Sequence, residues 1–176
     1  MKSQVEPLPA TSDPAFDFHS VFNERYPSVV RVISRLVQDR GRSEDIAMEV
    51  FWKLWRTASA QGENVNGWLY RAAVRMALDE LRRKKRRERY EKLFFISRPL
   101  PDPEQLHSIE ERQNHVRVVL SLMKSRDAEL LILRSEGLSY LELAQVTGLN
   151  SGSVRTLLRR AQQTFRKEFV KRYGET

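Results

Sequence analysis

The chain has 176 residues, of which 40% are hydrophobic, and its 31 lysines and arginines outnumber its 23 aspartates and glutamates, giving a formal net charge of +8. This length allows one domain or two small ones. The sequence contains no cysteine, which excludes disulfide bonds, thiolate catalysis and cysteine-ligated zinc and is typical of the reducing cytoplasm. The histidines, His19, His107 and His115, lack the spacing of metal ligands, so we expect neither a metal nor another cofactor.

Residues 1–14 are polar and contain three prolines, which predicts a disordered lead-in. They lack the apolar core of a signal peptide. No apolar run in the chain approaches the ~20 residues that span a bilayer. We therefore expect a soluble, cytoplasmic protein without a membrane partner.

The excess positive charge is confined to two parts of the chain, the block 82–90 and the residues from 114 onward. Lysines and arginines clustered in this way bind phosphates by releasing counterions, so nucleic acid is the expected partner. A membrane surface is the weaker alternative, because the helix with the basic block has no wide apolar stripe beyond what its own core consumes.

Helical spacing of apolar residues predicts a first helix over 16–40, with Pro27 at a helix start or a kink. Gly41 is expected to end this helix. Ser43 is the expected N-cap of a second helix, which extends to about Ala58.

A polar loop over 61–67 precedes a long helix that extends to about Arg89. One stripe of this helix is apolar and contains Leu69, Tyr70, Ala73, Val74, Met76, Ala77, Leu78 and Leu81. The opposite stripe contains Arg71, Arg75, Asp79, Arg82 and Arg86. Asp79 is expected to hold neighbouring arginines by i, i+4 pairing, and the cationic stripe suits a nucleic-acid backbone, although such stripes are also ordinary solvated faces. Trp68 is a candidate either for stacking on an unpaired base or for the core.

The second helix presents a different surface. Ile46, Val50 and Leu54 can face the core, whereas another face contains Asp45, Met48, Glu49 and Trp52. Met48 and Trp52 lie one turn apart among acidic residues. This pattern indicates either a surface for a partner protein or a face that a neighbouring helix of the same domain covers, and periodicity leaves both open.

Pro99, Pro101 and Pro103 exclude a helix and mark a linker. Helical patterns resume near Glu104, and no alternating run predicts a strand. We therefore expect an all-α chain with two small helical domains joined by a flexible linker. The expected boundaries are a lead-in over 1–14, a first domain over 15–92, a linker over 93–113 and a second domain over 114–176.

The second domain ends in a helix-turn-helix pattern. Ser139 and Glu142 form a capping box ahead of a short helix, and Gly148 supplies the turn. With Ala144 and Val154, Gly148 matches the signature of the motif. The outward amino-terminal part of the last helix contains Ser151, Ser153, Arg155, Thr156, Arg159 and Arg160. This part of the motif enters the major groove, where arginine can bind guanine; the alternative is a helical hairpin with a solvated basic face.

Three segments in this order resemble the motifs of extracytoplasmic-function sigma factors, small two-domain members of the sigma-70 family of bacterial RNA polymerase subunits. SEDIAMEVFWKLW resembles the helix that binds core polymerase, and WLYRAAVRMALDELRR resembles the helix that melts and reads the −10 element. LRSEGLSYLELAQVTGLNSGSVRTLLRRA resembles the helix-turn-helix that reads the −35 element. The resemblance covers nearly all of the chain from Phe16 to Tyr173.

The resemblance implies the roles of individual residues. Those implied to bind polymerase are Asp45, Met48, Glu49 and Trp52. Those implied to face the −10 element are Asn66, Trp68, Arg71, Arg75, Asp79, Arg82 and Arg83, with the loop 61–66 helping to hold an extruded base. Those implied to face the −35 element are Ser151, Ser153, Arg155, Thr156, Arg159 and Arg160. The implied partners are core RNA polymerase, promoter DNA and a separate anti-sigma factor, with no small-molecule substrate.

Two other functions compete with a promoter-reading initiation factor. An ordinary helix-turn-helix regulator would bind duplex DNA alone and form no stable complex with core polymerase. An enzyme such as a DNA recombinase needs a nucleophile with acidic or basic partners, but Ser43 and Ser139 are explained as helix caps and no Ser, His and Asp cluster is visible. We therefore expect no enzymatic activity and no catalytic residue.

Overall fold

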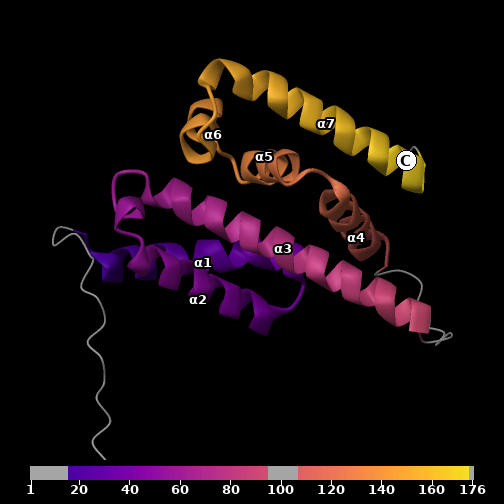
Figure 1. The fold of residues 1–176 in the computed structure, drawn as a ribbon, viewed down its shortest axis with the longest axis horizontal. Coiled ribbons are helices and arrows are strands. Elements are labelled where there is room, and N and C mark those ends of the chain that lie inside the picture. The colour runs from indigo at the N-terminus through magenta and orange to yellow at the C-terminus, as the bar shows by residue number, and fades with distance from the viewer. Residues whose placement is uncertain (1–15, 95–106, 175–176) are drawn as a thin grey trace, which may run out of the picture.

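The computed structural model describes residues 16–94 and 107–174. Within these ranges the chain is helical and contains no strand (Figure 1). The elements are α1 (Phe18–Val37), α2 (Arg40–Arg56), the 3-10 turn η1 (Ala58–Ala60), α3 (Val65–Phe94), α4 (His107–Leu122), α5 (Ser125–Ser135), α6 (Tyr140–Thr147) and α7 (Ser151–Tyr173). The expected all-α class with two helical units, α1–α3 and α4–α7, is confirmed. None of the described helices is long and apolar enough to cross a membrane.

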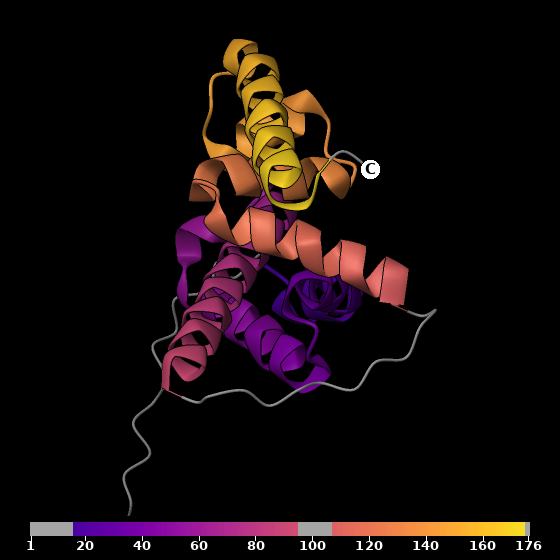
Figure 2. The ribbon, with the colours of Figure 1, turned by 90° about the vertical axis from the view of Figure 1, so that its right-hand side faces the viewer.

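The first unit is a bundle of α1, α2 and α3 (Figure 2). Apolar residues three or four positions apart on each helix meet in its interior, and the fully buried ones include Ile33, Ile46, Val50, Leu54, Leu69 and Leu78. Aromatic rings close one end of the bundle, where the buried ring of Phe51 lies 4.9 Å from that of Phe22 between centroids. Pro27 lies within α1 rather than at its start.

The boundary between α1 and α2 differs from the prediction. Gln38, not Gly41, ends α1 in a left-handed conformation with φ 54°, and Gly41 lies inside α2. Asp39, not Ser43, caps α2, because its carboxylate accepts from the Arg42 N–H at 2.8 Å. Ser43 is buried one turn later, and its hydroxyl donates to the Asp39 carbonyl at 2.6 Å. Two capping residues stand four positions apart here, and the earlier one begins the helix.

The turn chemistry of the second unit is confirmed. The Ser139 hydroxyl accepts from the Glu142 N–H at 3.2 Å, and the Glu142 carboxylate accepts from the Ser139 N–H at 2.7 Å. The Ser139 hydroxyl and backbone N–H lower the pKa of the Glu142 carboxyl because they favour its charged form. Gly148 ends α6 at φ 69°, which a residue without a Cβ adopts readily. Asn150 caps α7 by accepting from the Gly152 N–H at 2.9 Å.

Ser139→Ala is expected to lower the free energy of unfolding by about 1 kcal/mol, because the Glu142 N–H loses its acceptor at the start of α6. Urea denaturation of the full chain, followed by circular dichroism, measures this loss. Ser153→Ala is the matched control, since Ser153 is exposed inside α7. An equal loss in the two variants would contradict the capping role.

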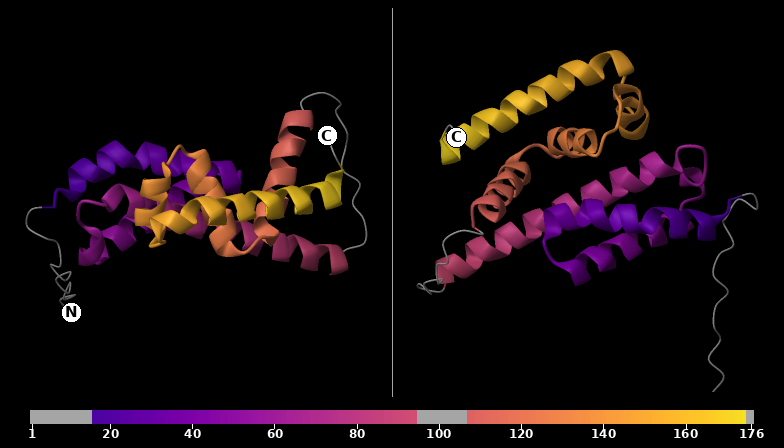
Figure 3. Two further views of the ribbon diagram at one scale, coloured as in Figure 1. Left: turned by 90° about the horizontal axis from the view of Figure 1, so that it is seen from above. Right: turned by 180° about the vertical axis from the view of Figure 1, so that it is seen from behind.

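The two units lie against each other. Helix α3 contacts α1 and α2 on one side and α4, α5 and α6 on the other, while α7 covers α4–α6 from outside (Figure 3). Helix α4 begins at His107, within the range 93–113 that was predicted to be a linker. The stretch from Pro99 to Pro103 lies outside the described residues. Because α3 is central, its side chains face both units.

Candidate functional site

The amino-terminal half of α7 carries the six residues expected to read DNA, and the structure leaves all of them exposed: Ser151, Ser153, Arg155, Thr156, Arg159 and Arg160. The opposite side of the helix is buried and contains Val154, Leu158 and Ala161. In the described ranges, the ion pairs of α7 are confined to Arg172 and Glu168, near its other end. The arginines in the first half of α7 are therefore available to another molecule.

The helix-turn-helix geometry depends on close contact between α6 and α7. Ala144 is buried, and its carbonyl accepts from the Leu149 N–H at 3.0 Å across the turn. Val154, in the first turn of α7, is fully buried. A small residue on α6 and a branched residue on α7 thus fix the direction in which α7 leaves the turn, as the sequence predicted.

A second candidate surface lies on α2. Met48 and Trp52 are each 51% exposed, although side chains of this kind are usually withdrawn from water. Asp45 and Glu49 flank them and are also exposed. The alternative that a helix of the same domain covers these residues is wrong for the described ranges. The four residues, named here the α2 face, form an apolar patch with an acidic border.

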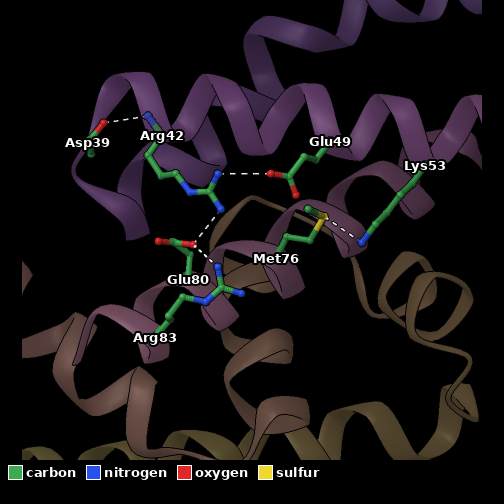
Figure 4. Close-up of polar contacts among 7 residues, drawn as sticks. All are labelled: Asp39, Arg42, Glu49, Lys53, Met76, Glu80 and Arg83. Atoms are coloured by element: carbon green, nitrogen blue, oxygen red, sulfur yellow. Dashed lines mark hydrogen bonds and ion pairs between the residues drawn. The ribbon is translucent and has the colours of Figure 1, made fainter. Parts of the chain in front are cut away.

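A network of charged residues fixes the α2 face relative to α3 (Figure 4). Arg42 donates from Nη1 to Glu49 at 3.3 Å and from Nη2 to Glu80 of α3 at 3.0 Å. Arg83 donates to the same Glu80 oxygen at 3.4 Å. The hydrogen bond that Arg42 donates to Glu80 is the main cause that raises the pKa of Arg42 above its ordinary value. The Glu80 carboxylate, which accepts from both Arg42 and Arg83, therefore joins α2 to α3.

The apolar stripe predicted for α3 faces the interior. Its buried members are Leu69, Ala73, Val74, Ala77, Leu78 and Leu81. Trp68 is half-buried, because part of its ring packs against the core and the rest is open to solvent. Asn66, two residues earlier, is exposed. The start of α3 thus combines a ring anchored in the core with an accessible amide.

The polar stripe of α3 faces the second unit. Arg71 donates from Nε to one carboxylate oxygen of Glu129 at 2.9 Å, and Arg75 donates from Nε to the other at 3.1 Å. Glu129 belongs to α5, and its side chain is 4% exposed. Arg71 and Arg75 are therefore paired within the chain, and Arg75 is at the same time solvated, since its side chain is 53% exposed.

The pairing predicted for Asp79 is also wrong. Its partner is Arg82, three residues later, at 3.7 Å, rather than a residue four positions away. Arg75 pairs with Glu129 instead, whose carboxylate is buried in a low dielectric that strengthens the bond, whereas Asp79 is exposed. Arg83 pairs with Glu80.

The loop predicted over 61–67 is shorter than expected, because α3 begins at Val65. Gln61 is buried and its amide donates to the carbonyls of Leu54 and Trp55, each at 2.9 Å, which closes the carboxyl end of α2. Residues 62–64 are exposed. Gln61 therefore supports the loop, while the next three residues present its outer surface.

Two family models match the chain. One is sigma-70 region 2, which covers residues 21–87, and the other is sigma-70 region 4, which covers residues 115–164. The first match contains the α2 face and the polar stripe of α3, and the second contains the helix-turn-helix.

This chain belongs to the sigma-70 family. It is similar to members of that family named as extracytoplasmic-function (ECF) sigma factors. A relative is the ECF RNA polymerase sigma factor SigE of Mycolicibacterium smegmatis, 29% identical over 156 residues, which are 84% of this chain and 60% of SigE. A second is the probable RNA polymerase sigma factor RfaY of Xanthomonas campestris pv. campestris, 27% identical over 83% of this chain and 38% of RfaY. The chain thus spans less than two thirds of either relative.

A solved structure shares the fold of this sigma factor. It is the sigma factor RpoE in complex with the anti-sigma factor NepR from Bartonella quintana. The TM-score is 0.53 with 21% identity, over 88% of this chain and 97% of that one. The likeness therefore extends through both helical units.

Sequence reasoning missed two residues at the contact between the units of this sigma factor. Glu129 lies within the apolar run from Ala128 to Leu133, and Arg117 lies within the apolar segment of α4. Arg117 is 5% exposed and donates from Nη1 to the Arg35 carbonyl of α1 at 3.3 Å. Burial lowers the pKa of Arg117. A charged residue inside an apolar run is the sequence signal that could have identified both.

Proposed function

We propose that this chain directs core RNA polymerase to promoters and starts transcription there. The α2 face binds polymerase, the polar stripe of α3 faces the −10 element, and the first half of α7 reads the −35 element. One observation carries the proposal: the matches to sigma-70 regions 2 and 4 follow each other in the order of the family. The residues of the α2 face and of the first half of α7 are exposed, and the polar stripe of α3 is rich in arginine.

The proposed division of labour follows from the chemistry of each surface. An exposed apolar patch with an acidic border suits a protein partner. Arginines near the start of a helix-turn-helix recognition helix can contact guanine in the major groove. Arginines on α3, close to the half-buried Trp68 and the exposed Asn66, suit a separated strand whose backbone binds cations and whose bases stack. Capture of an unpaired base would supply the strand opening, without catalytic chemistry of the chain's own.

We also propose a protein regulator and a cellular site. The structural relative from Bartonella quintana is described in complex with an anti-sigma factor, and a comparable partner is proposed for this chain. Its work with core polymerase would place it in the cytoplasm. No small-molecule cofactor is needed for any of the proposed contacts.

Run-off transcription tests the proposed function. The full chain is added to purified core polymerase on promoter fragments selected from the source genome, and discrete transcripts are expected that core polymerase alone does not make. Gel filtration of the same mixture should show the chain eluting with polymerase. A chain that binds duplex DNA tightly but neither joins polymerase nor yields transcripts would be an ordinary helix-turn-helix regulator.

A further inference from the structure

Three arginines of the polar stripe of α3, namely Arg71, Arg75 and Arg82, contact the second helical unit. Glu129 of α5 lies between Arg71 and Arg75, and each of its carboxylate oxygens accepts one guanidinium N–H, at 2.9 and 3.1 Å. Its side chain is 4% exposed, compared with 30% for Arg71 and 53% for Arg75. The carboxylate is thus almost withdrawn from water, while the arginines remain partly accessible.

This arrangement makes Glu129 depend on the two arginines. A buried carboxylate is costly unless charged or hydrogen-bonding partners satisfy it. The arginines, in contrast, do not need Glu129, because a guanidinium can bind a phosphate through the same N–H groups. A nucleic-acid strand and Glu129 would therefore compete for one pair of cations.

Arg82 strengthens the contact about two turns beyond Arg75 along α3. Its guanidinium donates to the Ser121 carbonyl at 3.2 Å and to the Met123 carbonyl at 3.0 Å, at the carboxyl end of α4, and to the Ser125 hydroxyl at 2.8 Å. A cation at this end of a helix also interacts favourably with the helix dipole. Three of the arginines assigned to the −10 element are thus engaged by α4 and α5.

The fit between the units is also tight at the start of α3. A Cβ added at Gly67 would lie 2.4 Å from Cγ2 of Val146 in α6. With valine at position 146, the buried position 67 therefore has room only for glycine, since the same Cβ would also lie 2.4 Å from Oδ1 of Asn64. The contact therefore extends over the amino-terminal half of α3, through which the proposed −10 residues are distributed.

Other features make the contact weaker than a domain core. A cleft of about 470 Å³ lies between α3 and α5 and is lined by Arg71, Arg75, Arg82 and Glu129, among others. Arg117 is buried where α4 meets α1, yet its Nε and Nη2 have no hydrogen-bond partner in the described part of the chain. Buried donors without acceptors oppose closure, so the closed arrangement is one that can open.

We propose that Glu129 acts as an intramolecular stand-in for a DNA phosphate and holds the chain in a closed, autoinhibited form. In this form the Glu129 carboxylate of α5 occupies the Nε–H groups of Arg71 and Arg75. A phosphate of the −10 element can take over both groups only when the two helical units separate. The proposal rests on the proposed role of the α3 stripe. Autoinhibition here is a property of the chain alone and requires no second protein.

A reversible disulfide lock tests whether opening is needed. The chain has no cysteine, so the pair Gly67→Cys and Val146→Cys would form its sole disulfide. The second substitution removes the valine Cγ2, which a Cβ at position 67 would meet at 2.4 Å. One C–C bond beyond that distance puts the two β-carbons no more than about 4 Å apart, within reach of a disulfide. Fluorescence anisotropy should show weaker binding of a single-stranded −10 oligonucleotide by the oxidised variant, and recovery on reduction. The wild type should not respond to the reducing agent. Equal binding before and after reduction would overturn the proposal.

Glu129→Gln tests the stand-in itself. Small-angle scattering should show a larger radius of gyration, and affinity for the oligonucleotide should rise by the reciprocal of the open fraction, about tenfold for a chain that is nine-tenths closed. Glu168→Gln removes the same charge from the far end of α7, where Glu168 pairs with Arg172, and is the control.

The outcomes of the two tests are distinct. An unchanged radius of gyration, or a gain in affinity no greater than that of Glu168→Gln, would overturn the proposal. Failure of the proposed function has a different signature, because the wild-type chain would then yield no transcript with core polymerase whatever the state of Glu129.

Discussion

Trp52→Ala is expected to weaken binding of the chain to core RNA polymerase by about 2 kcal/mol, roughly thirtyfold in Kd. The side chain is 51% exposed in the free chain and lies beside Met48, so a partner that covers the α2 face would bury much of it. Truncation removes this contact area without opening a cavity in the core, which α2 reaches through Ile46, Val50 and Leu54. Biolayer interferometry with immobilised core polymerase measures the loss.

Tyr90→Ala is the matched control for this experiment. Tyr90 is also a large aromatic residue on the surface, 62% exposed, but it lies on α3 away from the α2 face. Both variants should unfold at the denaturant concentration of the wild type. Wild-type affinity in the Trp52 variant, or an equal loss in the Tyr90 variant, would remove α2 from the proposed polymerase contact.

Arg155→Ala and Arg159→Ala are each expected to reduce discrimination between a −35 element and altered sequences by roughly 1–3 kcal/mol for a lost bidentate base contact. Both side chains are exposed on the first half of α7, whose buried side is held by Val154 and Leu158. The substitutions should therefore change base reading and leave the helix in place. Competition binding with duplexes mutated at one position at a time gives the discrimination directly.

Arg166→Ala separates base reading from attraction to the DNA backbone. Arg166 is exposed on α7 about two turns beyond Arg159, and a phosphate contact there should weaken binding to all duplexes by a similar factor and reduce the dependence on salt. If Arg155→Ala produced the same uniform loss with unchanged selectivity, the assignment of base contacts to α7 would be wrong.

Features that depend on a few neighbouring residues could be predicted from the sequence. Ser139 and Glu142 exchange their capping hydrogen bonds within one turn of helix. Gly148 adopts a left-handed conformation readily because it has no Cβ. The buried stripe of α3 follows from helical periodicity alone. Where two local signals competed, the prediction failed: Asp39 and Ser43 can both cap a helix, and only the folded chain shows that Asp39 does so.

The contact between the helical units could not be predicted, because it joins residues far apart in the chain. Glu129 is separated from Arg71 by 58 positions and from Arg75 by 54. Nothing within a helical turn of those arginines indicates a distant carboxylate, and the nearby Asp79 offered a plausible partner. The roles of the exposed residues on α2 and α7 remain predictions, since they concern molecules outside the chain.

The exposure of α7 in the closed chain has a consequence for timing. The side chains proposed for the upstream promoter box already face solvent, whereas Arg71 and Arg75 are held by Glu129. Under the proposed roles, α7 could bind duplex DNA while the arginines of α3 are still paired with Glu129. Reading of the upstream element and opening of the strands would then be separate steps, and a wrong sequence would be released before any base pair is broken.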